Sequence, residues 1–522
     1  MVAVERRWMA WWSGAATLLA GWLLVGPAVA QDGAPAKTEG QTPTARPATV
    51  LDPPGPPDDP DAERRPAYED APLPESAPLE PGQRRELPDY DGRAPAPASA
   101  AKSALWLPRI LFSPLYVVSE FVVRQPIGYV VTQAEKHKLP SVIIDALTFG
   151  PDRRAGIVPT ALVDFGFRPS VGVLVFVNDA FAKQNDLRVR AAWGGRDWKT
   201  FALSDYLELT DDQQLRLRAA FTHRPDWVFH GLGPDSGMER ARYSERRYDA
   251  AVEYRLNLWR SSSLNALVGV RDSAFDASVG CCDEVTVERA AWSGRFDLPE
   301  GVNDGYTALH SDLQVALDSR PRRHLQSARE GSDFVQPPGT GVRLAGRVGH
   351  GGGLREIADA APDEPARYAW VRYGGTLGGF VDLTNRQRVV GVQLVVDFVD
   401  PVADSGRIPF TELVSLGGKH PMRGYLEGRL RGRSAAVAVL EYQWPIWVWL
   451  DGKIQYELGN VFGRHLDGFE LDRLRQSFGL GLAVNNAREH AFEVLLGAGT
   501  RTFDEGSELE HLRFVVGASS GF

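Results

Sequence analysis

Apolar and polar side chains alternate with a period of two along most of the chain from about residue 157 onward. In the stretch 248–258 the even positions are apolar, while Asp249, Glu253 and Arg255 lie between them. A β-strand turns successive side chains to opposite faces, so such a stretch predicts a strand with one apolar and one polar face. Sixteen candidate strands of this kind begin near residues 157, 171, 186, 199, 213, 246, 262, 306, 341, 368, 387, 434, 451, 474, 489 and 511.

The alternation by itself fits either a soluble antiparallel sandwich or a barrel that spans a membrane. Strands of about ten residues, the length of a tilted membrane crossing, and heavy charge on the non-apolar face favour the barrel. In a barrel, lipid covers the apolar faces, water in the lumen solvates the charges, and closure pairs every backbone group. The sequence therefore predicts an all-β fold, a closed antiparallel transmembrane β-barrel of about 16 strands over residues 157–522.

The lengths of the connections predict which end of the barrel faces outside. If both termini are periplasmic, the connections after odd-numbered strands face outside and should be the longer ones. They are long at residues 225–245, 274–305, 351–367 and 400–433. The stretch 319–340 is an exception, since it would be a long turn on the periplasmic side, and it leaves the strand count open by two.

The N-terminal third differs in composition from the rest. Arg6 and Arg7, an apolar run and the small residues Ala28 and Ala30 predict a signal peptide over residues 1–30. The alternative, a transmembrane anchor, is disfavoured because the run is short and a Pro-rich stretch follows it. The export signal also favours the membrane barrel over the soluble sandwich. Residues 31–103 are rich in Pro, Ala and charge, which predicts a disordered periplasmic tether.

Residues 104–156 have apolar side chains near helical spacing, among them Leu111, Leu115, Val118 and Val122. This spacing predicts an amphipathic helical segment, on the inner leaflet of the membrane or under the barrel mouth. A plain packing helix is the alternative.

Charge and composition exclude several functions. A net charge of −9 and a pI near 5.7 leave no basic stripe, which argues against nucleic-acid binding. The histidines show no metal-binding spacing, and no Ser, His and Asp grouping predicts nucleophilic catalysis. We therefore expect no enzyme activity, no cofactor and no metal.

Cys281 and Cys282 are adjacent, and the sequence leaves open a vicinal disulfide or two unpaired thiols.

A glycine-rich loop from Leu416 to Tyr425 follows the eleventh candidate strand. It resembles the signature loop of the superfamily that contains the barrel-assembly insertase BamA, the TamA proteins and the two-partner-secretion transporters, also called the bacterial surface antigen family. That loop carries a Val-Arg-Gly-Phe/Tyr motif and folds back into the barrel. Here Met422 replaces Val, whereas Arg423, Gly424 and Tyr425 match.

Three further stretches resemble the family's motifs in the expected order. Phe229 to Ser236 is similar to its Gly-x-Gly loop, and Asp318 to Arg320, followed by Pro338 and Gly341, is similar to its central turn. Tyr456 to Phe462 is similar to its Phe-x-Asp-x-Gly strand, with Glu457 where the family has Asp. The resemblance covers about residues 105–522.

The resemblance implies that the loop 400–433 folds into the lumen. A guanidinium tucked away from bulk water needs an acidic partner, and alternation turns Glu457 and Glu441 inward. We therefore predict that Arg423 reaches one or both of them, against the alternative of a solvated surface arginine. The terminal Phe522 resembles the aromatic signal that barrel-assembly machinery reads at the end of outer-membrane barrels.

The function that the resemblance implies is insertion or translocation of proteins at the bacterial outer membrane, with the N-terminal tail in the periplasm. Its partners would be the outer-membrane lipid bilayer, the host barrel-assembly machinery for its own insertion, and client polypeptides or periplasmic factors. Family members usually carry periplasmic POTRA domains that capture clients, and no stretch of this sequence matches one. The alternative is a structural or surface-exposed barrel, or a passive pore, without insertase activity.

Overall fold

The computed structural model describes residues 106–279, 281–282, 284–321, 337–357, 367–402, 407–447, 450–484 and 492–518. The predicted signal peptide 1–30, the tether 31–103 and Phe522 lie outside these ranges. Sixteen long strands form one sheet: β2 Ala155–Asp164, β3 Ser170–Val177, β4 Asn185–Trp193, β5 Lys199–Thr210, β6 Gln213–Phe229, β7 Ala241–Asn257, β8 Ser263–Asp276, β9 Tyr306–Asp318, β10 Gly341–Gly353, β11 Ala369–Asp382, β12 Val389–Pro401, β15 Ser434–Trp447, β16 Leu450–Phe462, β17 Arg475–Val484, β18 Phe492–Thr502 and β19 Leu509–Ala518.

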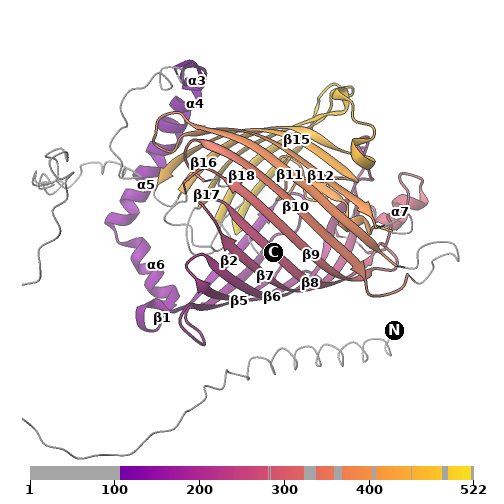
Figure 1. Cartoon of the computed structure of the whole chain (residues 1–522), viewed down its shortest axis with the longest axis horizontal. Coiled ribbons are helices and arrows are strands. Elements are labelled where there is room, and N and C mark those ends of the chain that lie inside the picture. Colours follow the sequence, from indigo (N-terminus) through magenta and orange to yellow (C-terminus); the bar gives the residue numbers. More distant parts are fainter. Residues whose placement is uncertain are drawn as a thin grey trace, which may run out of the picture. The chain divides into compact units, whose positions relative to one another are not determined.

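Each of these strands pairs antiparallel with its neighbours in the chain, and β19 pairs with β2 to close the barrel (Figure 1). The predicted fold class and strand number are confirmed, with most starts within three residues of those expected from the alternation. The exceptional stretch 319–340 does not change the count, because β9 and β10 pair directly on either side of it, with Asp318 opposite Arg343.

The two faces of the wall differ as the alternation predicts. Large apolar side chains are exposed on the outside, for example Val268 at 55%, Leu344 at 57% and Val392 at 58% exposure. Charged side chains such as Arg188 and Glu441 are turned inward and buried. Such an apolar exterior is favourable when lipid is the solvent. Closure of the barrel meets the other requirement of a bilayer, because it pairs the backbone groups of neighbouring strands. The fold is that of an outer-membrane barrel.

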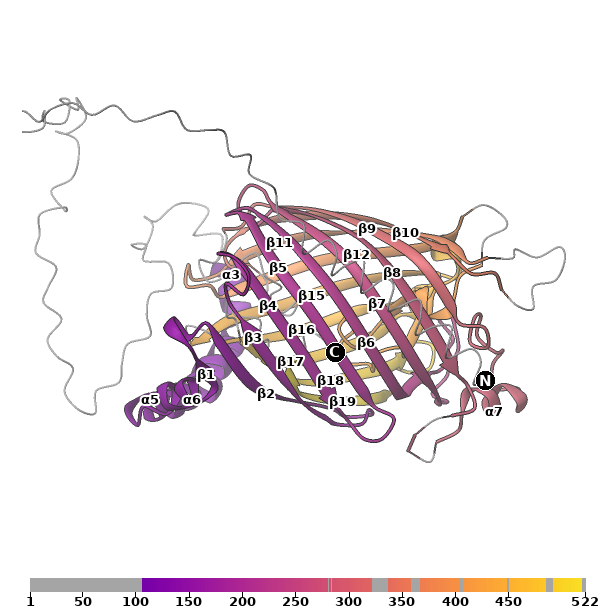
Figure 2. The same ribbon diagram turned by 90° about the horizontal axis from the view of Figure 1, so that it is seen from below.

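The two ends of the barrel are built differently. At one end lie the long connections, including the short helix α7 Val287–Trp292 and the hairpin β13 Val414–Leu416 with β14 Leu430–Gly432. At the other end lie the tight turns, such as the one between β5 and β6, together with the N-terminal helices (Figure 2). We call these the loop end and the turn end.

The N-terminal helices run α3 Trp106–Leu111, α4 Ser113–Val117, the π-helical turn η2 Val118–Arg124, α5 Gln125–Lys136 and α6 Leu139–Leu147. The two-residue strand β1 Thr148–Phe149 follows and pairs with the start of β2. Among the described residues, no helix combines the length and apolar character needed to cross a bilayer. The helical segment predicted over 104–156 is thus helical through Leu147 and then joins the barrel.

The lumen is filled at the loop end and hollow toward the turn end. An apolar cluster inside the loop end joins Phe410, Met422 and Tyr425 of the 407–433 loop to wall residues such as Tyr306 and Trp370. Below it lies a cavity of about 800 Å³ with a strongly charged lining that includes Asp312, Arg343, Arg347, Arg372, Asp397 and Lys453. The packed cluster closes the loop end, while the polar cavity faces the turns.

Candidate functional site

The 407–433 loop forms the candidate site, because it occupies the lumen and carries the motif that the sequence singled out. Its stem is the β13/β14 hairpin, in which Val414 opposes Gly432 and Leu416 opposes Leu430. The tip folds on itself through backbone bonds such as Gly417 N to the Pro421 carbonyl at 2.8 Å. The loop folds into the barrel, as the family resemblance implied.

Arg423 is held by two strands of the wall. Its guanidinium forms an ion pair with Glu493 on β18. Its backbone N–H donates to the Glu457 carboxylate on β16 at 2.7 Å, and the Ser477 hydroxyl donates to the same oxygen at 2.8 Å. Because Glu457 and Glu493 are only 2% and 1% exposed, each carboxylate depends on these donors to be satisfied away from bulk water.

The other three residues of the motif, Met422, Gly424 and Tyr425, are seated by close packing. The Gly424 N–H donates to the Ser477 hydroxyl at 2.9 Å, and a Cβ on Gly424 would lie 2.1 Å from the Ala498 carbonyl oxygen. The Tyr425 hydroxyl lies 3.0 Å from the Gln476 carbonyl, and a Cβ on Gly499 would overlap its ring. Met422, with a positive φ of 68°, is fully buried in the apolar cluster. The motif therefore needs glycine at its third position because backbone meets backbone there.

The acidic residues proposed from the sequence divide in their roles. Glu457 binds the backbone of Arg423, as described above. Glu441 on β15 pairs with Lys453 at 2.8 Å and accepts from Gln393 at 3.2 Å. Glu493, the partner of the guanidinium, was missed by the sequence reasoning, although its inward position follows from the alternation with Val494 and Leu496 on the other face. Nothing in the sequence says which inward carboxylate the loop meets.

A second set of ion pairs holds the loop farther along. Arg429 pairs with Glu510 of β19, and Arg475 of β17 binds the same carboxylate at 2.7 Å. Arg429 also donates to the Ser236 hydroxyl at 2.9 Å, which ties in the loop that resembles the family's Gly-x-Gly loop. Burial raises the pKa of nearby Glu427, but the positive charges of Lys419 and His420 outweigh burial and leave this pKa below its usual value.

The stem is anchored on the opposite side of the lumen through Glu412. Its carboxylate accepts from Arg271 at 2.8 Å and from the Tyr306 hydroxyl at 2.5 Å. Arg431 of β14 lies with its guanidinium 5.3 Å from the Phe410 ring centre. The loop is therefore braced on both sides of the lumen by ion pairs that are shielded from bulk water.

Arg513 on the last strand links this loop to the closure of the barrel. Its guanidinium forms a two-pronged salt bridge with Asp164 of β2, at 2.8 and 3.0 Å. A further nitrogen donates to the Gly418 and Arg423 carbonyls of the loop at 2.8 and 3.1 Å. One buried side chain thus contacts the first strand, the last strand and the in-folded loop.

The seam between β19 and β2 is short. Among the described residues, three pairs are in register (Val515 with Asp164, Val516 with Val163 and Gly517 with Leu162), whereas β11 and β12 share thirteen. The ring contact between Phe165 and Phe514 and the bond from the Phe165 N–H to the Phe514 carbonyl extend it toward the loop end. The preceding part of β2 contains Pro159, and proline within a sheet is confined to edges because it lacks an N–H.

No family model matches the chain, and no curated protein matches it. Solved structures do. BamA from Haemophilus ducreyi lacking POTRA domains 1–3 is 15% identical over 70% of each chain, with a TM-score of 0.44. CdiB from Acinetobacter baumannii is 13% identical over 70% of this chain and 60% of its own, with a TM-score of 0.40. The outer-membrane receptor FauA from Bordetella pertussis is 13% identical, with coverages of 70% and 57% and a TM-score of 0.30.

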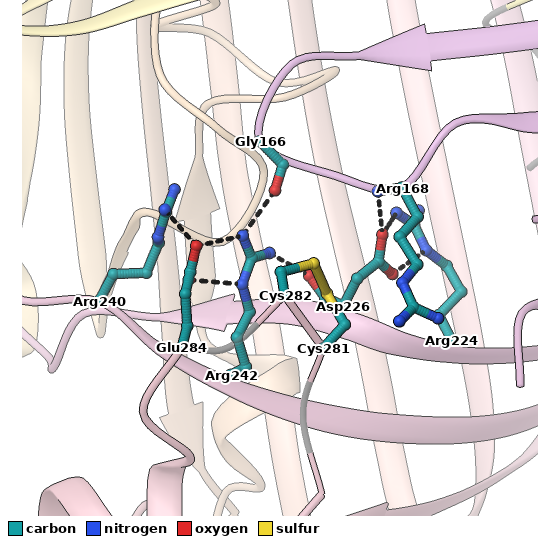
Figure 3. The surroundings of a disulfide bond; sticks show 9 residues. All are labelled: Gly166, Arg168, Arg224, Asp226, Arg240, Arg242, Cys281, Cys282 and Glu284. Atoms are coloured by element: carbon teal, nitrogen blue, oxygen red, sulfur yellow. Dashed lines mark hydrogen bonds and ion pairs between the residues drawn. A yellow bond between two sulfur atoms is a disulfide. The ribbon is translucent and has the colours of Figure 1, made fainter.

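Cys281 and Cys282 form a vicinal disulfide in the long connection after β8, which settles the alternative that the sequence left open. Glu284, just after it, binds Arg240 and Arg242 (Figure 3). Arg242 also donates to the Gly166 carbonyl at 2.7 Å, two residues beyond Asp164 of the seam. The disulfide therefore lies beside the contacts that support the end of β2 (Figure 3).

Replacing both cysteines with serine is expected to change the melting temperature little, because a bridge between adjacent residues closes almost no loop and so removes little chain entropy. Glu284→Ala should lower the melting temperature more, since it leaves the fully buried Arg242 without its carboxylate. Thermal unfolding in detergent, monitored through the loss of heat-modifiable mobility in gels, shows which of the two replacements lowers the melting temperature more. A larger effect of the cysteine replacement would contradict it.

Arg423→Ala is expected to lower the free energy of unfolding by about 3 kcal/mol, because it leaves Glu493 buried without a partner. Adding Glu493→Gln should recover part of this loss, since the uncompensated charge is then removed. Urea unfolding of Arg423→Ala, Glu493→Gln and the double variant measures both effects. Purely additive losses would show that the two side chains do not interact.

Proposed function

We propose that this chain belongs to the superfamily of outer-membrane assembly and translocation barrels, and that it assists the insertion or translocation of other polypeptides. The observation that carries the proposal is the seam, in which, among the residues that the structure describes, three backbone pairs and the Arg513–Asp164 salt bridge hold the first and last strands together. Unpaired N–H and C=O groups on a strand edge are a template for an incoming strand.

The in-folded loop supports the same function. Arg513 and Glu510 of β19 both bind this loop, so the position of the last strand depends on the loop being seated. On the seam edge of β2, a client strand would compete with β19 at residues 162–164 and with β1 at Ala155 and Gly156, because the other edge of β2 is paired with β3 over eight residues. The seam is thus the place in the wall where opening breaks the fewest backbone bonds among the described strands.

The alternative of a passive pore is less well supported. The apolar cluster around Phe410, Met422 and Tyr425 fills the loop end of the lumen, so a continuous aqueous path would need the loop to leave its seat. We expect low steady conductance for the protein in planar bilayers.

The test uses the full-length mature protein in liposomes, with a urea-unfolded eight-stranded outer-membrane barrel as the client. Faster client folding than in empty liposomes supports the proposal. A cysteine pair at Val163 and Val516, which are directly opposed, locks the seam on oxidation, because opposed Cα atoms lie about 4.5–5.5 Å apart, within disulfide range. Cys281→Ser and Cys282→Ser keep the background free of other thiols.

The oxidised protein should lose the acceleration, and reduction should restore it. The reduced form is the matched control, since it differs only in the bond across the seam. No acceleration by the unlocked protein, together with steady ion conductance, would favour the passive pore. Acceleration that persists in the locked form would show that the seam is not the route.

A further inference from the structure

We propose that the helices from Trp106 to Leu147 form a collar on the outer wall of the barrel, and that the outward face of this collar is embedded in the interfacial layer of the bilayer. The partner is lipid, at the leaflet that surrounds the turn end. This inference does not depend on insertase activity, because it concerns how the barrel is held in its membrane.

The first step is that the collar covers the outside of the wall. On β15, Leu440 faces outward and is 38% exposed, while Glu441 points into the lumen toward Lys453. Farther along the same outward face, Tyr442, Trp444 and Ile446 are almost completely buried. What buries them is the collar, whose inner side packs on this face through Phe112, Leu115, Val123, Ile127 and Val131.

Polar contacts fix which side of the collar faces the barrel. Arg388, just before β12, donates to the Ser119 hydroxyl at 3.0 Å and pairs with Glu120. Glu120 also pairs with Arg124 at 3.0 Å, and Arg109 donates to the Leu383 carbonyl at 2.6 Å. These charged groups are satisfied at the contact with the barrel, so they do not impose a polar character on the outward side.

The outward side of the collar is apolar over several turns. Eight aromatic and aliphatic side chains there are between 47% and 73% exposed: Trp106, Ile110, Leu111, Val117, Val118, Phe121, Val122 and Val130. Tyr129 joins them at 59% exposure. An apolar patch of this extent is unfavourable in water and marks an interaction surface.

Lipid is the occupant because of where this surface lies. The collar rests on the outer face of β15 and β16, and that face continues without a break into side chains that lipid must solvate, such as Leu440 and Leu480. Tryptophan and tyrosine favour the membrane interface, and Lys136 at the end of α5 and the following His137 are exposed, where lipid headgroups can meet them. Bilayer already surrounds the wall at this place, so the patch needs no second protein to cover it.

The collar is also joined to the seam. After α6 ends at Leu147, Thr148 of β1 pairs with Gly156 of β2. Embedding the collar therefore fixes the depth at which β2 begins, because two backbone pairs connect them directly.

The experiment places one fluorescent label at a time on the full-length mature protein in liposomes, in the Cys281→Ser, Cys282→Ser background. Val122→Cys and Val130→Cys carry an NBD label on the outward side of the collar. Leu496→Cys, on the outer wall at 53% exposure, is the lipid control, and Glu505→Cys, in the connection between β18 and β19, is the water control. Heat-modifiable mobility confirms that each labelled protein is folded.

Labels at 122 and 130 should be quenched by doxyl lipids at least half as strongly as the label at 496, and iodide should quench them several-fold less than the label at 505. Quenching by iodide to the level of the water control would overturn the proposal. Protection from both quenchers would also overturn it, because a second copy of the chain or another protein would then cover the face. Val122→Asp combined with Val130→Asp gives an independent check, since these charges should shift the melting temperature in liposomes more than in detergent-free amphipol.

Discussion

Replacing Gly424 with valine is expected to expel the in-folded loop from its seat. A Cβ at this position would lie 2.1 Å from the Ala498 carbonyl oxygen, and the obstacle is strand backbone, which cannot move aside without breaking the pairing of β18. Overpacking usually costs about 1–3 kcal/mol. Here the larger loss comes from the anchors that leave with the loop, including the Arg423–Glu493 pair. Trypsin cleavage after Lys419 and Arg423 in the folded protein measures the release.

A matched control comes from a glycine with open space around it. A Cβ on Gly346 of β10 would meet nothing within 4 Å, so Gly346→Val should leave both trypsin resistance and the melting temperature nearly unchanged. Gly424→Ala should give an intermediate result, because it adds the clash without the branched side chain. Trypsin resistance of Gly424→Val equal to that of the parent would show that the loop is not seated by this close approach.

Arg513→Ala is expected to loosen the seam and the loop together. It removes the two-pronged bond to Asp164 and leaves the Gly418 and Arg423 carbonyls without this donor. Breaking a buried ion pair by removing one partner costs about 3–5 kcal/mol. Within the described part of the chain, three backbone pairs hold β19 to β2, so the loss of stability should fall mainly on the seam. Arg513→Lys should rescue little, because an ammonium cannot reproduce the fork that binds carboxylate and carbonyls at once.

Cross-linking measures the effect on the seam. With cysteines at Val163 and Val516, the yield of the disulfide under mild oxidation reports how often the two strands are in register. Arg513→Ala should lower this yield several-fold. Arg347→Ala is the control, since it removes a salt bridge to Asp397 on the lumen wall away from the seam. Equal yields in the two variants would argue that Arg513 has no special part in closure.

The predictions for Gly424→Val and Arg513→Ala both involve the contacts of Arg513. Gly424→Val should also reduce cross-linking across the seam, because an expelled loop no longer offers the carbonyls that hold the guanidinium in place. If it leaves the seam unaffected, the loop and the closure are independent, and the proposed link between the seated loop and opening of the wall fails.

Much of the barrel could be predicted from the sequence because a strand in a membrane wall has to satisfy two solvents. The alternation in 248–258 identifies β7 without knowledge of its neighbours, and the same holds for most of the sixteen strands. The stretch 319–340 was the weak point, since it carries no alternation, and only the pairing of β9 with β10 settles the strand count. The Arg-Gly-Tyr motif likewise identified the loop that enters the lumen.

The partners inside the barrel could not be predicted in this way. The period of two says that Glu441, Glu457 and Glu493 point inward, but not how the strands are rotated around the loop, and this rotation assigns Glu493 to the guanidinium and Lys453 to Glu441. For the same reason, no pattern in the sequence indicates that Arg513 and Asp164, separated by almost the whole barrel in the chain, meet in the structure.

The sequence by itself determined the local properties of this protein: which segments become strands, which face of each is apolar, and which loop carries the motif that resembles the in-folded loop of the family. Tertiary structure alone decided what closure brings together, namely the short seam, the arginine that bridges it and the collar on the outer wall. The physical reason is that alternation is set by neighbours along the chain, whereas these contacts depend on the register and tilt of strands that are far apart in sequence.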